Sequence, residues 1–400
     1  MTSAAARPLD GIRVLEVGQL LAGPFAACVL GYFGAEIIKI EPPGGDPLRN
    51  WRVLRDGTSL WWYSLARNKK SVSIDLQTER GRELVKQLAT RCDVVIENFK
   101  PGTMEKWGLG PTVLKALRPD LIYTRVSGYG QSGPYASRPG FASVCEAVGG
   151  LRYINGFPDR PPVRPNLSLG DSLAGLHAVI GVLLALLARR GAHGEGQTVD
   201  VAIYESVFNM LEGVVPEYDG AGAVRGPSGS TLTGIVPSNT YLCADDKYVV
   251  IGANGDSLFQ RLMRAVGRED MAIDPRLANN AGRVRHEKEI DKVIAAWTRA
   301  HPSAQILTIL DEISVPGGPI YSVADMAADP HFNARGLFEQ VDVDGAPLRI
   351  PAILPRLEST PGATQWPGPK FGEHTDAVLT QLLGLSADQL SELRSKKVIQ

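Results

Sequence analysis

The first half of this chain alternates strand-like and helix-like segments, and that alternation restricts its fold more than any other feature. Short apolar runs predict strands at 12–17, 37–41, 94–97 and 121–126, and the segment 79–91 predicts a helix. Such alternation is typical of α/β proteins with a mainly parallel sheet flanked by helices. We therefore expect a Rossmann-like sheet. Ligands of these sheets bind at the carboxyl ends of the strands, so the loops after the four strands should carry the chemistry.

The second half predicts a smaller α/β block and a tail. A stretch containing Gly and Pro, 215–237, precedes a predicted strand at 248–252 and predicted helices at 256–266 and 287–300. The tail after residue 329 is rich in Pro and closes with a helical segment near 387–396. The Gly- and Pro-containing stretch therefore marks a boundary between two domains.

Composition indicates a soluble cytoplasmic enzyme. The 42 Lys and Arg residues nearly cancel the 43 Asp and Glu residues, so the net charge is too small to attract nucleic acid or an anionic membrane. The longest nearly pure apolar run, 177–188, is too short to cross a bilayer. The four cysteines are far apart and the histidines lack ligand spacing, so we expect reduced thiols and no metal site.

Asp171 is the strongest single candidate for a catalytic residue. It follows Gly170 and begins a strongly apolar segment whose large residues recur at steps of three and four: Leu173, Leu176, Ile180, Leu183, Leu184 and Leu187. This spacing predicts a core helix that buries their shared face. The unpaired N–H groups and the dipole at a helix N-terminus keep a carboxylate ionised and nucleophilic. From these residues alone, a simple helix cap is the alternative.

A nicotinamide cofactor does not fit the loop after the first strand. That loop has the sequence VGQLLAGP, in which Gly18 and Gly23 are five positions apart. The glycine that would let the backbone approach a pyrophosphate is missing, so the loop should serve another ligand.

Six sequence blocks in order carry a resemblance to a known family. They lie at 8–46 (from PLDGIRVLEVGQ to EPPGGD), 67–76 (RNKKSVSIDL), 94–102 (VVIENFKPG), 127–135 (SGYGQSGPY), 170–172 (GDS) and 372–375 (GEHT). Over nearly its whole length the chain resembles the class III CoA-transferases of the CaiB/BaiF type, which include formyl-CoA and carnitine CoA-transferases.

The resemblance implies an activity. It makes Asp171 a nucleophile that takes an acyl group from CoA as a mixed anhydride and then carries CoA as a thioester. Backbone N–H groups near 19–22 or in the SGYGQSG loop are candidate donors to the oxyanions. Coenzyme A is then a substrate and product, and no tightly bound cofactor is expected.

The resemblance also implies an architecture. It implies an interlocked homodimer with a discontinuous large domain, 1–214 and 330–400, a linker at 215–237 and a small domain at 238–329. The GEHT segment would tie the returning tail to the large domain.

The resemblance places CoA over the loops that follow the early strands. The residues expected to contact it are Gln19, Leu21, Ala22, Leu65, Arg67, Asn68, Lys69, Asn98, Phe99, Lys100 and Lys106. The basic side chains among them can meet phosphates through charge-assisted hydrogen bonds. Where family members often have Arg after the second strand, this chain has Pro42, and Arg49 or Arg52 is the expected replacement.

Arg164, seven residues before Asp171, is the expected contact for a distal carboxylate of the acceptor acid. A dicarboxylic acceptor with succinyl-CoA as donor fits this assignment, although a surface Arg beside prolines is an equal alternative.

Two other functions stay open. An acyl-CoA racemase of the same superfamily would need a His and Asp pair, but this chain has Phe141 at the corresponding place. A CoA-binding protein without transferase activity is the other.

Overall fold

The computed structural model describes residues 7–400 and divides into two compact units. Unit 1 comprises the chain up to Leu151, Pro165–Glu212 and Ala334–Gln400. Unit 2 comprises Arg152–Arg164 and Gly213–Asn333. The expected small domain lies within unit 2, and so does the expected linker 215–237. The tail from residue 334 belongs to unit 1.

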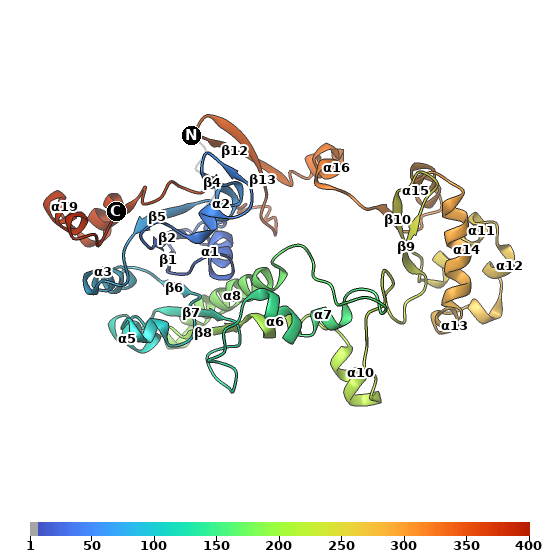
Figure 1. The fold of residues 1–400 in the computed structure, drawn as a ribbon, viewed down its shortest axis with the longest axis horizontal. Coiled ribbons are helices and arrows are strands. Elements are labelled where there is room, and N and C mark those ends of the chain that lie inside the picture. Colours follow the sequence, from blue (N-terminus) through green and yellow to red (C-terminus); the bar gives the residue numbers. More distant parts are fainter. Residues whose placement is uncertain (1–6) are drawn as a thin grey trace. The chain divides into compact units, whose positions relative to one another are not determined.

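A parallel sheet of six strands forms the centre of unit 1 (Figure 1). Its strands, in spatial order, are β5 (Lys69–Ser73), β2 (Glu36–Glu41), β1 (Arg13–Glu16), β6 (Val94–Glu97), β7 (Ile122–Ser127) and β8 (Thr198–Ala202). Every neighbouring pair is parallel. The parallel α/β architecture expected from the sequence is therefore confirmed.

The sequence did not predict the two edge strands of this sheet. β5 has the sequence KKSVS and β8 has the sequence TVDVA, so neither forms an apolar run. The four predicted strands lie between them and are almost entirely buried. Apolar patterning therefore identified the centre of the sheet and missed its margins.

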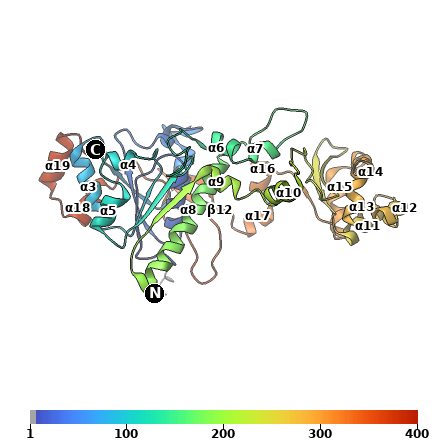
Figure 2. The same cartoon turned by 90° about the horizontal axis from the view of Figure 1, so that it is seen from below.

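Helices cover both faces of the sheet (Figures 1 and 2). One apolar cluster joins a face of the sheet to α1 (Ala22–Tyr32) and α8 (Leu169–Ala188). The other cluster joins the opposite face to α3 (Glu79–Ala89), α5 (Pro111–Leu117), α18 (Thr375–Leu383) and α19 (Ala387–Ser395). The remaining helical segments of unit 1 are η1 (Pro47–Asn50), α2 (Leu60–Leu65), α4 (Thr103–Lys106), α6 (Ala142–Val148), η2 (Arg189–His193) and α9 (Ile203–Phe208).

The face of α8 that packs inside unit 1 is not the one expected. The buried residues are mostly small, and they are Gly170, Ala174, Gly175, Ala178, Val179, Val182, Ala185 and Leu186. Of the six large residues predicted to face the core, Leu173 is half-buried and the other five are exposed, from 37% for Leu183 to 64% for Leu187. The small face allows close packing: a Cβ at Gly175 would lie only 2.9 Å from the carbonyl oxygen of Ala22 on α1. The prediction of the core face was therefore wrong.

By length and composition, Leu169–Gly191 is the one segment among residues 7–400 that could cross a membrane. Its small-residue face packs against α1, β7 and β8, so this helix forms part of the core of unit 1.

The tail returns to the sheet through the GEHT segment. The hydroxyl of Ser71 accepts a hydrogen bond from the Gly372 N–H at 2.8 Å, and the Ser73 N–H donates to the hydroxyl of Thr375 at 3.0 Å. This segment therefore has the structural role expected of it. The tail also contains a hairpin, β12 (Phe338–Val343) and β13 (Ala346–Pro351), and the short strands β3 (Leu54–Arg55) and β4 (Thr58–Ser59) form another.

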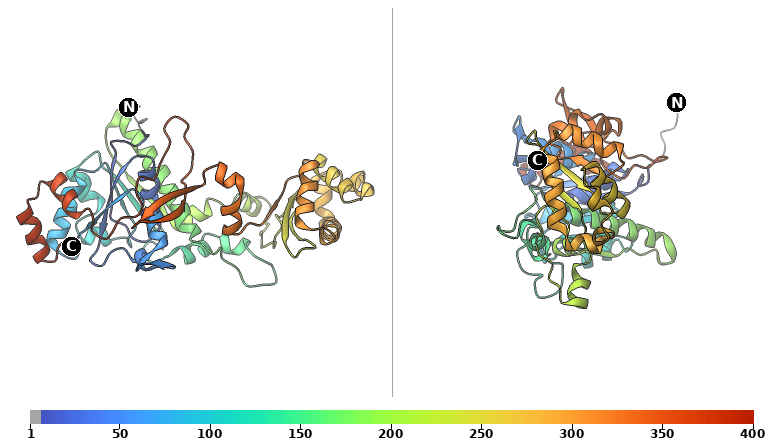
Figure 3. Two further views of the ribbon diagram at one scale, coloured as in Figure 1. Left: turned by 90° about the horizontal axis from the view of Figure 1, so that it is seen from above. Right: turned by 90° about the vertical axis from the view of Figure 1, so that its right-hand side faces the viewer.

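Unit 2 contains a small antiparallel sheet, β11 (Gly317–Pro319), β10 (Tyr248–Gly252) and β9 (Ser238–Leu242), with helices packed on it (Figure 3). Along β10, Val249 and Ile251 are buried whereas Tyr248 and Val250 are exposed, so one face of this sheet supports the core. α14 (Glu287–Arg299) contacts β9, and α15 (Ser303–Glu312) contacts β10 and β11. The other helical segments of this part of the chain are α7 (Leu151–Ile154), α10 (Val214–Ala221), α11 (Asp256–Ala265), α12 (Glu269–Ala272), η3 (Pro275–Leu277), α13 (Asn280–Arg285), α16 (Val323–Ala328) and α17 (Pro330–Ala334).

Candidate active site

Asp171 lines a pocket of about 390 Å³ within unit 1. The walls come from α1, α2, the first two turns of α8 and the segment 351–354, which begins with the last residue of β13. Most of the lining is apolar, with Phe25 and Trp61 as its aromatic members. An apolar pocket with few polar groups suits chemistry from which water is excluded.

The first turn of α8 presents Asp171 without using it as a cap. The N-cap residue is Ser168, and Asp171 stands third in the helix, in the acidic first turn. The helix dipole stabilises a carboxylate at this position. Asp171 is therefore not the N-cap residue of α8, and it lines the wall of the pocket.

Two buried side chains of α6 lie beside this turn. Glu146 accepts a hydrogen bond from the Gly170 N–H at 3.1 Å. Burial, and next the negative charge of Asp171, raise the pKa of Cys145 to about 11, which keeps this thiol protonated. Sequence reasoning missed Glu146, although a carboxylate inside the apolar segment ASVCEAV was a usable signal.

The loop after β1 reaches the same pocket through Leu21. Its Gln19 is held by Asn98: the Gln19 N–H donates to the Asn98 side chain and the Asn98 amide donates to the Gln19 carbonyl, both at 2.8 Å. A Cβ at Gly18 would lie 2.5 Å from the Asn98 side-chain oxygen, so only glycine allows this approach. Asn98 therefore holds the loop after β1 in place. It also directly follows β6, where the sequence predicts a contact with CoA.

The charged RNKK segment lies inside unit 1. Arg67 donates to the carbonyls of Ser64 and Pro351, both at 2.7 Å, and Lys69 pairs with Glu16 at 2.7 Å. Both side chains are buried, and their polar atoms have partners within the chain. These side chains therefore hold the tail and the β1 loop, and Arg67 also lines the pocket of Asp171. Their contact with CoA stays a prediction.

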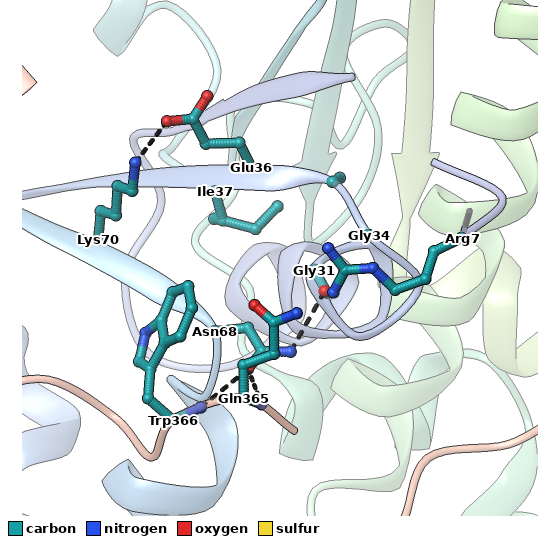
Figure 4. Close-up of a pocket in the computed structure, with 10 residues that line it drawn as sticks. Arg7, Gly31, Gly34, Glu36, Ile37, Asn68, Lys70, Gln365 and Trp366 are labelled. Atoms are coloured by element: carbon teal, nitrogen blue, oxygen red, sulfur yellow. Dashed lines mark hydrogen bonds and ion pairs between the residues drawn. The ribbon is translucent and has the colours of Figure 1, made fainter. Parts of the chain in front are cut away.

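Asn68 likewise binds backbone rather than pointing to solvent (Figure 4). Its amide donates to the carbonyls of Gly31 and Ala363, and its side-chain oxygen accepts the Gln365 N–H at 2.7 Å. The same close-up shows Lys70 paired with Glu36 at 2.6 Å. The small pocket drawn there, about 140 Å³, is bordered by Glu36 and Lys70 from the amino ends of β2 and β5.

The loop after β6 offers exposed basic side chains. Lys100 and Lys106 are exposed, and Phe99 packs edge-on against Trp107 at 5.1 Å between ring centres. Glu97 fixes the start of this loop by accepting the Phe99 N–H at 2.8 Å, and burial raises the pKa of Glu97 to about 7.

Of the two arginines expected to replace the family residue at Pro42, only Arg52 is exposed. Arg49 is buried in a bidentate pair with Glu41.

Arg164 is exposed and groups with unit 2. Leu21, Leu65 and Asp171 border one pocket. Gln19 lies in the loop before α1, and Ala22 is the first residue of α1. Among residues 7–400 there is no group of three or more His, Cys, Asp or Glu side chains that could hold a metal ion.

A sequence profile for CoA-transferase family III matches residues 9–375. The chain belongs to this family. It is 50% identical over 396 residues to the succinyl-CoA–D-citramalate CoA-transferase of Chloroflexus aurantiacus, covering 98% of both chains. It is 35% identical over 387 residues to the succinate–glutarate CoA-transferase of Agrobacterium fabrum, covering 94% of this chain and 96% of that one.

The fold of the family III chain agrees with a solved structure. The crystal structure of a CAIB/BAIF family protein from Brucella suis aligns with 94% of this chain and all of that chain, with a TM-score of 0.83 and 34% identity. The chain is therefore an enzyme that moves CoA between an acyl-CoA and a carboxylic acid.

Proposed function

We propose that this CoA-transferase takes CoA from succinyl-CoA and gives it to a short dicarboxylic acid of the citramalate type. The observation that carries this proposal is the 50% identity, over 98% of both chains, to a relative named for succinyl-CoA and D-citramalate. The relative named for succinate and glutarate also acts on dicarboxylic acids. Arg164 is the proposed contact for the carboxylate that does not react, because a guanidinium can bind it through two hydrogen bonds.

Asp171 is the proposed carrier of the acyl group. Its carboxylate oxygen attacks the thioester carbonyl of succinyl-CoA, and the CoA thiolate leaves to give a mixed anhydride. The thiolate then attacks the Asp171 carbonyl, releases succinate and forms an aspartyl-CoA thioester. The acceptor carboxylate repeats these two steps in reverse order, so covalent catalysis divides one exchange into easier steps. The apolar lining of the pocket supports this scheme because water would hydrolyse the anhydride.

For the CoA itself we propose contacts along the carboxyl edge of the sheet. Lys100 in the loop after β6, Lys106 at the end of α4 and Arg52 after η1 are exposed cations suited to the phosphates. Gln19, Leu21, Ala22, Leu65, Asn98 and Phe99 supply the other proposed contacts. Among the four N–H groups of residues 19–22, those of Gln19 and Leu20 donate within the chain. The N–H groups of Leu21 and Ala22 are therefore the proposed donors to the oxyanions.

The active assembly is proposed to be an interlocked homodimer in the cytoplasm. The exposed leucine face of α8 supports a partner, because monomeric proteins seldom leave a continuous apolar surface of this kind in water.

Replacement of Asp171 tests the mechanism. Asp171→Asn should abolish transfer, because an amide is a poor nucleophile. It should leave CoA binding and the fold nearly unchanged, because the Asn side chain has nearly the same shape as that of Asp. An acceptor acid labelled with heavy oxygen in its carboxylate should leave one labelled oxygen on Asp171 of the wild-type enzyme, detected by peptide mass spectrometry. Normal turnover by Asp171→Asn, or label absent from Asp171 after turnover, would rule out the aspartyl mechanism.

A screen of acyl-CoA donors and acids, read out by mass spectrometry of the acyl-CoA products, tests the substrates. The expected best pair is succinyl-CoA with a dicarboxylic acid. CoA binding without exchange for any pair would favour the non-catalytic alternative, and inversion at the α-carbon would favour the racemase.

A further inference from the structure

The loop between β1 and α1 holds a conformation that its sequence does not favour. Leu20 has a φ of 63°, in the left-handed region where a side chain with a Cβ is strained. The next residue, Leu21, lines the Asp171 pocket. Because Leu20 does not prefer this conformation by itself, neighbouring groups must impose it.

Three side chains hold three consecutive residues of this loop. Lys39 donates to the Gly18 carbonyl at 3.0 Å, and Asn98 holds Gln19 from both sides. The Leu20 N–H donates to both carboxylate oxygens of Asp46, at 3.2 and 3.3 Å. Of these contacts, the one to Asp46 acts directly at the strained residue.

Asp46 is itself fixed from several sides. It lies in the loop after β2, is 1% exposed, and pairs with Lys39 at 2.8 Å. The Leu48 N–H donates to its carboxylate at 2.9 Å, and its own N–H donates to Glu41 at 2.8 Å. Burial opposes ionisation of Asp46, but Lys39 and the two backbone donors outweigh it and hold its pKa below the ordinary value. The carboxylate is therefore a rigid anionic acceptor.

The ion pairs continue from Lys39 to the start of α1. Lys39 also pairs with Glu16 at 2.7 Å, and Glu16 pairs with Lys69 at 2.7 Å. Lys69 then donates to the Pro24 carbonyl, again at 2.7 Å. A continuous set of buried contacts thus joins Leu20, through Asp46, Lys39, Glu16 and Lys69, to Pro24. It holds the loop at both ends, and its two carboxylates balance its two ammonium groups.

We propose that Asp46 is a positioning residue for CoA transfer. By fixing Leu20 in the left-handed conformation, it sets the place of the Leu21 and Ala22 backbone at the pocket of Asp171. The inference rests on the proposed function, in which those N–H groups stabilise the oxyanions. It assigns to the buried ion pairs a role in the rate of the chemical steps in addition to their role in stability.

The test compares kcat with KM for succinyl-CoA and an acceptor dicarboxylate, per folded enzyme. Asp46→Ala should lower kcat at least tenfold and change KM less than threefold, because misplaced donors affect the transition state more than substrate binding. Adding Leu20→Gly to Asp46→Ala should restore kcat at least threefold, because glycine adopts a positive φ without an anchor. A purely structural role for Asp46 predicts no such recovery.

Asp93→Ala is the matched control. Asp93 lies just before β6, at the amino ends of the strands, whereas Asp46 lies beyond the carboxyl end of β2. Asp93 accepts the Arg13 N–H at 2.9 Å and pairs with Arg118 and Arg189. Its replacement should lower the thermal midpoint as Asp46→Ala does but leave kcat per folded enzyme within twofold.

The outcomes separate this inference from the proposed function. Wild-type enzyme that transfers no CoA from succinyl-CoA would refute the function. Wild-type transfer together with an unchanged kcat in Asp46→Ala would refute only the positioning role. If Asp46→Ala does not fold, Asp46→Asn carries the test, since it retains an acceptor and loses the charge. It should lower kcat at least threefold with KM unchanged, and an unchanged kcat would overturn the inference.

Discussion

Burying a charged side chain costs several kcal/mol unless partners compensate, and even a paired charge is often less stabilising than an apolar side chain. Unit 1 nevertheless buries Glu16 of β1, Lys39 of β2 and Lys69 of β5 completely. Stability alone does not account for them. The contacts of Lys39 with Gly18 and of Lys69 with Pro24 support the proposed positioning role, because a fixed β1 loop requires strong and directional partners.

Arg164 is the residue on which acceptor choice should depend. Arg164→Ala should lower kcat/KM for dicarboxylic acceptors by about 10- to 100-fold, since a hydrogen bond to a charged group contributes about 1.5–3 kcal/mol. Monocarboxylic acids of the same chain length should lose less than threefold. Arg164→Lys should cause an intermediate loss of kcat/KM for dicarboxylic acceptors, because an ammonium cannot form the bidentate pair that a guanidinium forms with a carboxylate. Equal losses for both classes of acid, in steady-state assays, would show that Arg164 acts through packing.

At the scale of elements, α8 has two different apolar faces. Its small-residue face packs against α1 and the sheet, and its leucine face is exposed within one chain. Close approach of α1 explains the first face, because a larger residue at position 175 would meet the Ala22 carbonyl and Phe25. The start of α8, and with it Asp171, is therefore positioned by backbone proximity to α1.

Gly175→Ala tests this packing. Alanine normally stabilises a helix interior by about 1 kcal/mol relative to glycine. At this position we expect the reverse, a loss of about 1–3 kcal/mol in the free energy of unfolding, because the new Cβ overlaps backbone. Gly220→Ala in α10 is the control, since a Cβ there meets nothing within 4 Å, and it should not destabilise. Urea unfolding of the three proteins measures both changes; a stabilised Gly175→Ala would contradict the close approach.

The elements also show how far the sequence could predict this structure. The central strands β1, β2, β6 and β7 were predictable because they are apolar runs, whereas β5 begins with two lysines whose partners come from distant segments. The periodicity of α8 identified a helix, but it could not distinguish a face that packs inside the chain from one left exposed. The same limit applies to the site. A motif located Asp171, but charge alone could not show that Arg67 and Lys69 are buried.

At the scale of the whole molecule, the interlocked dimer is a proposal that the family resemblance implies, and the exposed leucine face of α8 fits a partner subunit. Interlocked rings cannot separate by sliding, so subunit exchange should be as slow as unfolding of a closing segment. Two differently tagged preparations, mixed under native conditions, should therefore form almost no hybrid dimer over days, as measured by native mass spectrometry. Denaturing and refolding the mixture should produce hybrids. A simple dimer held only by the leucine face would instead exchange without denaturant, and a monomer at micromolar concentration by light scattering would exclude both assemblies.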